Sequence, residues 1–250
     1  MVNNKKIYFA SDQHFGAPTV EKSFPREQKF VSWLNEIKKD AEAIFLVGDL
    51  FDFWFEYKTV VPKGFVRVLG KLAEIRDSGI PIYFFVGNHD LWMDDYFEKE
   101  LNIPVYYNNQ EFTFGNKTFL KGHGDGKGPG DLGYKRMKKV FTNPFSKWLY
   151  RWLHPDIGVR LAQYFSVKNK LISGDADVKF LGEDNEWLIL YAKRKIATKH
   201  YNYLIFGHRH LPMNISLNTK SKYINLGDWI NHFTYAVFDE KELELKKWIN

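Results

Sequence analysis

Five short polar stretches carry carboxylate, amide and imidazole side chains, the groups that bind metal ions in a protein without thiolates. Each stretch follows an apolar, β-branched or aromatic run. In order they are Asp12-Gln13-His14, Gly48-Asp49, Gly87-Asn88-His89-Asp90, Gly122-His123 and Gly207-His208-Arg209-His210. Residues i and i+2 of a strand point the same way. Asp12 with His14, and His208 with His210, are therefore each expected to present two ligands to one place.

Seven side chains in these stretches are candidate ligands, which is too many for one tetrahedral ion and suits two ions of higher coordination number. They are Asp12, His14, Asp49, Asn88, His123, His208 and His210. Asp49 offers a carboxylate that can bridge both ions. Two ions about 3.5–4 Å apart can activate a bridging water and neutralise a phosphoryl group during in-line displacement, so the set favours hydrolysis of phosphoric esters.

Each stretch taken alone has an ordinary structural interpretation. A lone Asp-x-His or His-x-His is more often a surface pair, Gly48-Asp49 is typical of a turn, and Asn88 could cap a helix. Lys127 is followed by Gly128 rather than Ser or Thr, which argues against a phosphate-binding loop at Gly122 to Lys127. Five placements after apolar runs in a consistent order outweigh these separate interpretations.

The elements that must position these side chains alternate between strands and helices, which predicts an α/β fold. Strands are expected at Lys6–Ala10, Ala43–Val47, Pro81–Val86, Thr118–Lys121 and Tyr203–Phe206. Helical stripes are expected around Phe30 to Ile37 and Phe65 to Ile75, and further antiparallel strands at Tyr223–Leu226, Tyr235–Phe238 and Leu243–Trp248. Ligands in such folds bind beyond the carboxyl ends of the strands, where all five stretches lie.

The segment from about 127 to 199 interrupts this alternation, and we interpret it as a helical cap inserted over the site of a single domain spanning 1–250. Apolar side chains at helical spacing, from Phe145 to Leu153, predict an amphipathic helix. Residues 134–170 contain nine basic side chains and one acidic side chain, a net charge of +8, which leaves −2 for the rest of the chain. The stripe could contact substrate or an anionic membrane surface, or pack into the core.

Composition excludes several classes of protein. With 250 residues and 44% hydrophobic content, the chain can bury a sizeable core. It contains no cysteine, so disulfides and thiolate metal sites are excluded, and ions such as Mn²⁺ and Mg²⁺ are favoured. No apolar run approaches the roughly 20 residues that span a bilayer, so a cytoplasmic location is expected.

The order Asp-x-His, Gly-Asp, Gly-Asn-His-Asp, Gly-His, Gly-His-x-His over residues 12–210 resembles the calcineurin-like metallophosphoesterase family. The resemblance implies a two-sheet α/β sandwich flanked by helices, with catalytic residues His89, Asp49 and His208. It also implies two divalent ions per chain, favoured here as Mn²⁺. One would be held by Asp12, His14, Asp49 and His210, and the other by Asp49, Asn88, His123 and His208. His89 would contact the substrate phosphate or protonate the leaving oxygen.

Within that family, the stretch from Gly48 to Trp54, the Gly-Asp pair at Asp125 and the helical insertion are similar to members acting in lipid A biosynthesis. Those members cleave the pyrophosphate bond of UDP-2,3-diacylglucosamine, giving UMP and 2,3-diacylglucosamine 1-phosphate. The resemblance implies a UDP-linked acylated sugar as substrate and a peripheral location on the cytoplasmic face of the inner membrane. Substrate contacts are expected at Asn88, His89, Asp131, Trp148 and Trp152. Those members carry Arg where this chain has His89, and Thr where it has Arg209.

Two other functions are compatible with the same residues. A metallophosphoesterase acting on another phosphodiester or phosphomonoester is suggested by His89, because His lacks the bidentate, permanently charged fork that Arg offers to phosphate. A non-catalytic scaffold that binds a membrane or a protein is disfavoured because all seven candidate ligands are present. The basic segment contains no nucleic-acid reader motif, so no specific nucleic-acid partner is expected.

Overall fold

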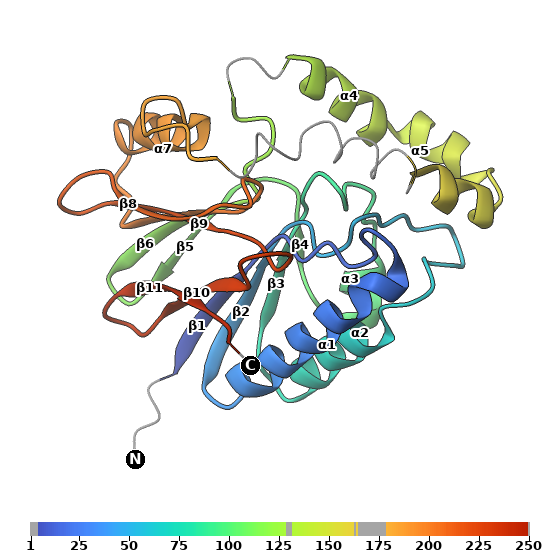
Figure 1. The fold of residues 1–250 in the computed structure, drawn as a ribbon, viewed down its shortest axis with the longest axis horizontal. Coiled ribbons are helices and arrows are strands. Elements are labelled where there is room, and N and C mark those ends of the chain that lie inside the picture. Colours follow the sequence, from blue (N-terminus) through green and yellow to red (C-terminus); the bar gives the residue numbers. More distant parts are fainter. Residues whose placement is uncertain (1–4, 129–131, 163, 165–178, 250) are drawn as a thin grey trace.

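The fold is formed by two β-sheets packed face to face with helices on both outer sides (Figure 1). It is seen in a computed structural model that describes residues 5–128, 132–162, 164 and 179–249. The first sheet has the strand order β11-β10-β1-β2-β3-β4, and the second has the order β5-β6-β7-β9-β8. The predicted two-sheet α/β architecture is therefore confirmed.

The first sheet is built mainly from alternating strands and helices of the amino-terminal half. Its elements are β1 (Lys6–Ala10), α1 (Val20–Ile37), β2 (Ala41–Val47), α2 (Val66–Asp77), β3 (Ile82–Phe85), α3 (Tyr96–Leu101), β4 (Val105–Tyr106), β10 (Thr234–Phe238) and β11 (Leu243–Lys247). Strands β1 to β4 are parallel, and β10 pairs antiparallel with β1. Strand β1 therefore lies between the second strand of the chain and one of its last.

The second sheet carries the later ligand stretches. Its strands are β5 (Gln110–Phe114), β6 (Lys117–Lys121), β7 (Tyr203–Phe206), β8 (Pro212–Ser216) and β9 (Lys222–Leu226). The predicted strand at Tyr223–Leu226 exists, but the prediction that it is antiparallel is only half right. Strand β9 runs antiparallel to β8 and parallel to β7, because the β8–β9 hairpin returns the chain to the edge of β7.

Three apolar layers hold these elements together. Aromatic side chains from both sheets fill the space between them, as where Phe9 of β1 stacks on Phe119 of β6 with ring centroids 6.2 Å apart. The stripe predicted on α1 is buried against the first sheet through Phe30, Trp33 and Leu34. The helix α7 (Trp187–Ile196) covers the outer face of the second sheet. Burial of apolar surface on both faces of both sheets fixes the orientation of the strands that carry the ligands.

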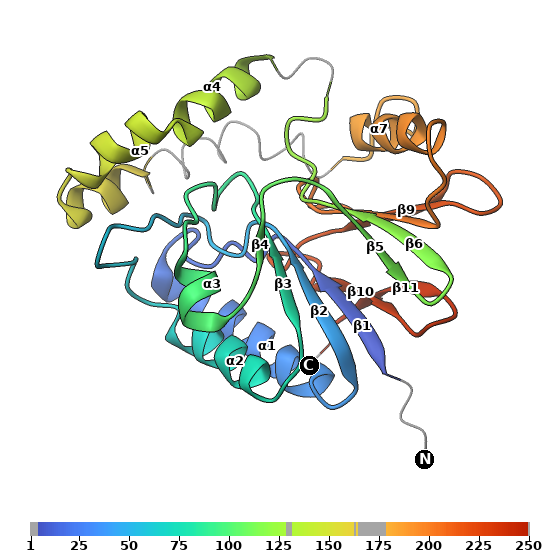
Figure 2. The ribbon, with the colours of Figure 1, turned by 180° about the vertical axis from the view of Figure 1, so that it is seen from behind.

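Helices also occur in the described part of the segment from 127 to 199, and the interpretation of this segment as a cap inserted over the site stays a prediction. They are α4 (Leu132–Thr142), α5 (Pro144–Arg151), a helical stretch at residues 155–162, and α7. Helices α4 and α5 lie beyond the carboxyl ends of the strands, and the opposite view agrees (Figure 2). No helix in the described part of the chain is long and apolar enough to cross a membrane.

Candidate metal centre

All five ligand stretches lie at the carboxyl ends of parallel strands. Asp12 and His14 follow β1, Asp49 follows β2, and Asn88 follows β3 in the first sheet. In the second sheet, His123 follows β6, and His208 and His210 follow β7. These two strands are adjacent and parallel. Because the two sheets pack face to face, their carboxyl edges meet, and the structure brings all seven predicted ligands into one cluster.

One group of ligand atoms comes from the two ends of the chain. The Nε2 atoms of His14 and His210 lie 3.2 Å apart, and Asp12 Oδ1 lies 3.4 Å from His210 Nε2 and 3.8 Å from His14 Nε2. Asp49 Oδ2 lies 3.6 Å from His14 Nε2. Separations of about 3–4 Å are those of ligand atoms that share one ion at bond lengths of about 2.1 Å. These atoms therefore have the chemistry and spacing of a cation site.

A second group adjoins the first through Asp49. Its Oδ2 atom lies 3.2 Å from His123 Nε2, which in turn lies 3.1 Å from Asn88 Oδ1. His208 approaches the same amide oxygen through Nδ1, at 2.7 Å. Asp49 therefore contacts ligands of both groups and occupies the bridging position that the family resemblance implies.

The backbone at the ligands differs from the sequence expectation. The spacing predicts that Asp12 with His14, and His208 with His210, project together, because alternate residues of a strand share a face. Instead the strands end before these residues, at Ala10 and Phe206, and all four lie in loops with φ between 46° and 68°. Asp49 is likewise left-handed, with a φ of 53°. The ligands converge because the loops curl back over the strand ends, at the cost of a backbone region that side chains other than Gly seldom occupy.

Glycines allow these loops to approach one another. A Cβ on Gly87 would lie 2.1 Å from Asp49 Oδ1, and a Cβ on Gly207 would lie 2.4 Å from Asp12 Oδ2. Asp90 then joins the loops after β2 and β3 by accepting hydrogen bonds from the Leu50 and Gly87 backbone N–H groups, at 3.0 and 2.6 Å. The contacts of the ligand carboxylates thus require residues without side chains at these two positions.

A second set of polar groups orients the imidazoles. The Nδ1 atoms of His14 and His210 face the carboxylates of Asp52 and Asp228, at 3.3 and 3.5 Å. His123 Nδ1 lies 2.9 Å from the Val47 carbonyl oxygen, which fixes a proton on Nδ1 and leaves Nε2 to bind the ion. The sequence alone assigns no role to Asp52 or Asp228. Asp52 lies three residues after a ligand, but only the fold places Asp228 behind His210.

Burial and neighbouring charges shift the ligand pKa values in different directions. Burial lowers the pKa of His123, but attraction to Asp49 outweighs it and raises that pKa to about 10. Burial lowers the pKa of His208 to about 4, reinforced by repulsion from His123. Burial raises the pKa of Asp49, but attraction to His123 and His89 outweighs it and holds the pKa well below its usual range. A cation that binds His123 must therefore displace a proton, whereas His208 is already neutral at pH 7.

His89 lies at the edge of the ligand cluster. Its Nδ1 atom is 2.9 Å from the Asp52 carbonyl oxygen, and its ring meets that of His14 edge to face with centroids 4.7 Å apart. A carbonyl can only accept, so Nδ1 carries a proton and Nε2 is the atom that can exchange one. The backbone N–H of His89 donates to Asp49 Oδ1 at 2.8 Å, which ties this residue to the bridging carboxylate.

The predicted substrate contacts in the insertion are placed differently from the ligands. Trp148 lies on α5 and Trp152 is the C-cap residue of that helix. Their stripe is exposed, with relative exposures of 51% and 75% for the two residues, so the alternative that this stripe packs into the core is wrong. Tyr150, on the inner side of α5, packs instead against Trp92 and Phe55 with centroids 4.5 Å away. A role of the two tryptophans in substrate binding stays a prediction. Asp131 lies outside the described residues.

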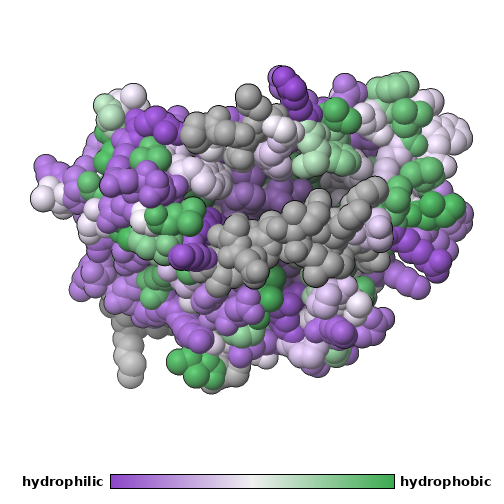
Figure 3. Space-filling model, turned by 45° about the horizontal axis from the view of Figure 1, so that its top comes forward, coloured by the Kyte–Doolittle hydropathy of each residue, from purple (hydrophilic) through white to green (hydrophobic). Residues whose placement is uncertain are grey.

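The face above the strand ends is hollowed, and its visible lining is hydrophilic (Figure 3). Near it, Asp125 accepts hydrogen bonds from the Tyr134 hydroxyl at 2.7 Å and from Lys138 Nζ, which attaches α4 to the loop that follows His123. Burial raises the pKa of Asp125, but attraction to His123 and Lys138 outweighs it and lowers that pKa. The insertion is therefore anchored directly beside the ligand cluster.

The sequence of this chain is similar to that of known proteins. The sequence model of the calcineurin-like phosphoesterase family matches residues 5–212. The UDP-2,3-diacylglucosamine hydrolase of Porphyromonas gingivalis is 40% identical over 255 residues, covering 96% of this chain and 97% of its own length. The protein of the same name from Edwardsiella ictaluri is 26% identical, covering 86% of this chain and 83% of its own. Among solved structures, the Yfce phosphoesterase of E. coli aligns with a TM-score of 0.47 and 16% identity, covering 97% of this chain and 92% of that one.

The family match covers more than half of the chain and includes all five ligand stretches. The residues that the structure brings together are the oxygen and imidazole donors that divalent ions require, in two groups that share Asp49. The chain therefore belongs to the calcineurin-like phosphoesterase family, and it is a metal-dependent hydrolase of phosphoric esters.

Proposed function

We propose that this enzyme hydrolyses the pyrophosphate bond of UDP-2,3-diacylglucosamine, giving UMP and 2,3-diacylglucosamine 1-phosphate, as a step of lipid A biosynthesis. The observation that carries the proposal is the 40% identity, over 96% of the chain, to a protein named UDP-2,3-diacylglucosamine hydrolase. The cluster of seven oxygen and imidazole donors supports it, because such donors suit a pair of divalent ions, which can promote hydrolysis of phosphoric esters. The basic segment at 134–170 supports it further, because a nucleotide diphosphate is polyanionic.

Two Mn²⁺ ions are the proposed cofactors. Asp12, His14, Asp49 and His210 would hold one ion, and Asp49, Asn88, His123 and His208 would hold the other. When bound, such a pair supplies Lewis acidity at the phosphoryl oxygens and a water nucleophile at neutral pH. Imidazole, carboxylate and amide donors without thiolates fit Mn²⁺ and related divalent ions. Asp49, through its two contacts, fixes the spacing of the two groups.

The proposed chemistry assigns distinct tasks to residues of this chain. Asn88 places its amide oxygen against His123 and His208 and so fixes the edge of the second group. His89 would contact the phosphate oxygens through Nε2, with its ring held by the Asp52 carbonyl. The departing group of a pyrophosphate is itself a phosphate, whose second pKa is about 6, so it can leave without taking a proton. His89 would therefore act on this substrate through charge and hydrogen bonding.

The test is release of UMP from UDP-2,3-diacylglucosamine by the purified protein loaded with Mn²⁺. We expect UMP and the acylated sugar phosphate in equal amounts. Reaction in ¹⁸O-labelled water should place the label in UMP, because attack is expected at the phosphorus nearer the uridine. Hydrolysis of bis(p-nitrophenyl) phosphate by a preparation that is inert on the sugar nucleotide would contradict the proposed substrate and favour a simple phosphodiesterase, the second function suggested by His89.

We also propose that α4 and α5 rest on the cytoplasmic face of the inner membrane, close to where the acyl chains of the substrate lie. The exposed apolar stripe comprises Phe145, Trp148, Leu149, Trp152 and Leu153. Hydrophobic side chains gather at this end of the molecule (Figure 3). Exposed basic side chains at Lys135, Arg136 and Lys139 lie on the preceding helix. Indole rings beside basic side chains suit the interface of an anionic bilayer.

Replacing Trp148 and Trp152 together by Ser should weaken binding to vesicles that contain anionic lipid by roughly a hundredfold, because each indole contributes about 1.5 kcal/mol on insertion. Flotation of the protein with vesicles measures the effect. Ile249→Ser is the matched control, since Ile249 is 83% exposed at the far end of the chain and should leave binding unchanged. Equal flotation of the double variant and the wild type would contradict membrane contact by α5.

A further inference from the structure

The loop between β7 and β8 holds two ligands in an unusual backbone conformation. The N–H of Arg209 donates to the Gly207 carbonyl oxygen at 2.8 Å, closing a three-residue turn around His208, whose φ is 68°. Turns of this kind with positive φ at the centre are rare and strained. His210 follows with a φ of 51°. Strained backbone persists only where surrounding contacts fix it, so the loop needs external support.

Part of that support comes from inside the ligand cluster. The N–H of His208 donates to the Asp12 carboxylate, at 3.0 Å from Oδ2, and the Asn225 amide donates to the Gly207 carbonyl oxygen at 2.7 Å. These contacts hold the first half of the loop. They do not involve Arg209, the residue between the two ligands His208 and His210.

The side chain of Arg209 provides a second anchor. Its Nε and Nη2 atoms each lie 3.0 Å from a carboxylate oxygen of Glu186, and Nη2 also donates to the Lys179 carbonyl oxygen at 2.6 Å. The side-chain exposures of Arg209 and Glu186 are 4% and 0%. A bidentate pair buried to this degree is geometrically specific, and both of its partners in 179–186 belong to the end of the insertion.

The first turn of α7 touches the ligand loops at further points. Glu186 is the N-cap residue of α7. The next residue, Trp187, sets its ring edge to face with His208, at 5.7 Å between centroids. The methyl groups of Leu188 lie 3.1 Å from where a Cβ on Gly124 would be, directly after His123. Three consecutive residues at the start of α7 thus contact both loops of the second sheet that carry ligands.

We infer that Arg209 and Glu186 form a positioning pair, which ties the β7–β8 loop to the first turn of α7 and so holds His208 and His210 in metal-binding geometry. The position of α7, where the insertion returns to the core, then sets the affinity of the centre for divalent ions. This inference rests on the metal pair proposed above and is independent of the identity of the sugar nucleotide.

A purely structural ion pair predicts a different outcome. Removing one partner of a buried ion pair leaves the other charge unpaired, which lowers the stability of the whole fold without selecting one set of metal ligands. A positioning pair must change metal binding in a variant that remains folded. Outer groups that orient metal ligands typically alter metal affinity by about 10–100-fold when they are removed.

The experiment compares Mn²⁺ binding by the full-length wild type with that of Arg209→Lys and Glu186→Gln. Lys keeps the charge but not the bidentate fork, and Gln keeps the size of Glu186 and one acceptor oxygen. Calorimetric titration should show an affinity for Mn²⁺ lowered by about 10–100-fold in both variants. The electron paramagnetic resonance line shape of the bound Mn²⁺ should change, and circular dichroism should show that both variants are folded.

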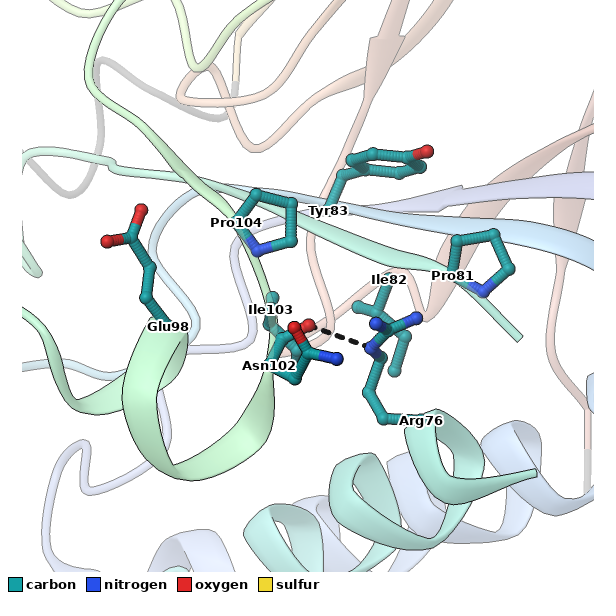
Figure 4. A pocket seen from close by; sticks show the side chains of 8 residues that line it. All are labelled: Arg76, Pro81, Ile82, Tyr83, Glu98, Asn102, Ile103 and Pro104. Atoms are coloured by element: carbon teal, nitrogen blue, oxygen red, sulfur yellow. Dashed lines mark hydrogen bonds between the residues drawn. The ribbon is translucent and has the colours of Figure 1, made fainter. Parts of the chain in front are cut away.

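Arg76→Lys is the matched control. Arg76 also donates two hydrogen bonds to backbone carbonyls, at Asn102 and Ile80, but it lines a surface pocket of about 380 Å³ at the opposite end of β3 (Figure 4). Its variant should bind Mn²⁺ as the wild type does. The double variant Glu186→Gln/Arg209→Lys should bind Mn²⁺ no more weakly than the single variant with the lower affinity, since both changes break the same contact.

Unchanged Mn²⁺ affinity and line shape in folded Arg209→Lys and Glu186→Gln would overturn the inference. An equal loss of affinity in Arg76→Lys would also overturn it, because the effect would then be general. Wild-type protein that takes up no Mn²⁺ would instead contradict the metal pair of the proposed function. A wild type that binds Mn²⁺ but leaves the sugar nucleotide intact would contradict only the proposed substrate.

Discussion

Asp49→Asn should lower kcat for phosphoric ester hydrolysis by about a thousandfold or more, while leaving the protein folded. Asn has nearly the same shape, but it removes the charge of the carboxylate that contacts both ligand groups, through His14 and His123. Metal ions supply several kcal/mol of transition-state stabilisation, and each 1.4 kcal/mol is a factor of ten in rate. Steady-state release of UMP measures kcat, and elemental analysis should show fewer than two ions per chain.

Asp77→Asn provides the control, because Asp77 is exposed at the end of α2 and should leave both rate and metal content unchanged. Loss of activity in Asp49→Asn that is fully restored by raised Mn²⁺ would assign Asp49 to metal affinity alone. Retention of a tenth or more of kcat at ordinary Mn²⁺ would contradict the bridging role.

Substitutions of His89 should affect two kinds of substrate unequally. An alkyl phosphodiester releases a poor leaving group that needs a proton, so His89→Ala should lower its turnover by about 10²–10⁴-fold. A pyrophosphate releases a phosphate that leaves without a proton, so His89→Arg should keep turnover of UDP-2,3-diacylglucosamine within about tenfold of the wild type, because Arg contacts phosphate bidentately. On the alkyl diester His89→Arg should lose turnover as His89→Ala does, since the guanidinium does not give up its proton.

Parallel kcat and KM measurements on both substrates separate these roles. A loss of kcat by His89→Arg that is equal on the two substrates would contradict the view that His89 acts on the pyrophosphate through charge and hydrogen bonding, without proton transfer. His232→Ala is a suitable comparison, because His232 contacts Asp228 at 3.1 Å and is partly exposed, but it is not among the predicted ligands. It should change kcat much less than His89→Ala.

The general plan of this molecule could be predicted from local patterns. The apolar runs that end at Ala10, Val47 and Phe206 are strands, and polar stretches with Asp or His follow each of them. Ligands bind at the carboxyl ends of parallel strands, so the stretches could be predicted to lie together. The helix stripe of α1 became buried as its spacing indicated. These patterns are local in sequence, and burial of the apolar face decides them.

Features that depend on contacts between distant segments could not be predicted. The left-handed backbone at Asp12 and His208 arises because each loop is held by the other, through the hydrogen bond from the His208 N–H to the Asp12 carboxylate. Nothing in the spacing of either motif indicates it. Asp228 and Glu186 acquire their roles only by lying next to His210 and Arg209. The α5 stripe showed that a surface would be apolar, but not that it would be exposed.

The position of β1 between β2 and β10 has a consequence for how the enzyme is made. The first ligand stretch is synthesised early, yet Asp12 also accepts a hydrogen bond from the Trp229 N–H through its carbonyl oxygen, at 3.1 Å. His208, His210 and the carboxylate of Asp228 come from the same late part of the chain. A nascent chain translated up to the end of β6 therefore has three of the four donors of the first ligand group and two of the four donors of the second, and the edge of β1 that pairs with β10 is still open. Both ligand groups are completed only when the loop after β7 has been translated, and the edge of β1 is covered only by β10, so the centre cannot be fully assembled before the carboxyl-terminal part of the chain is made.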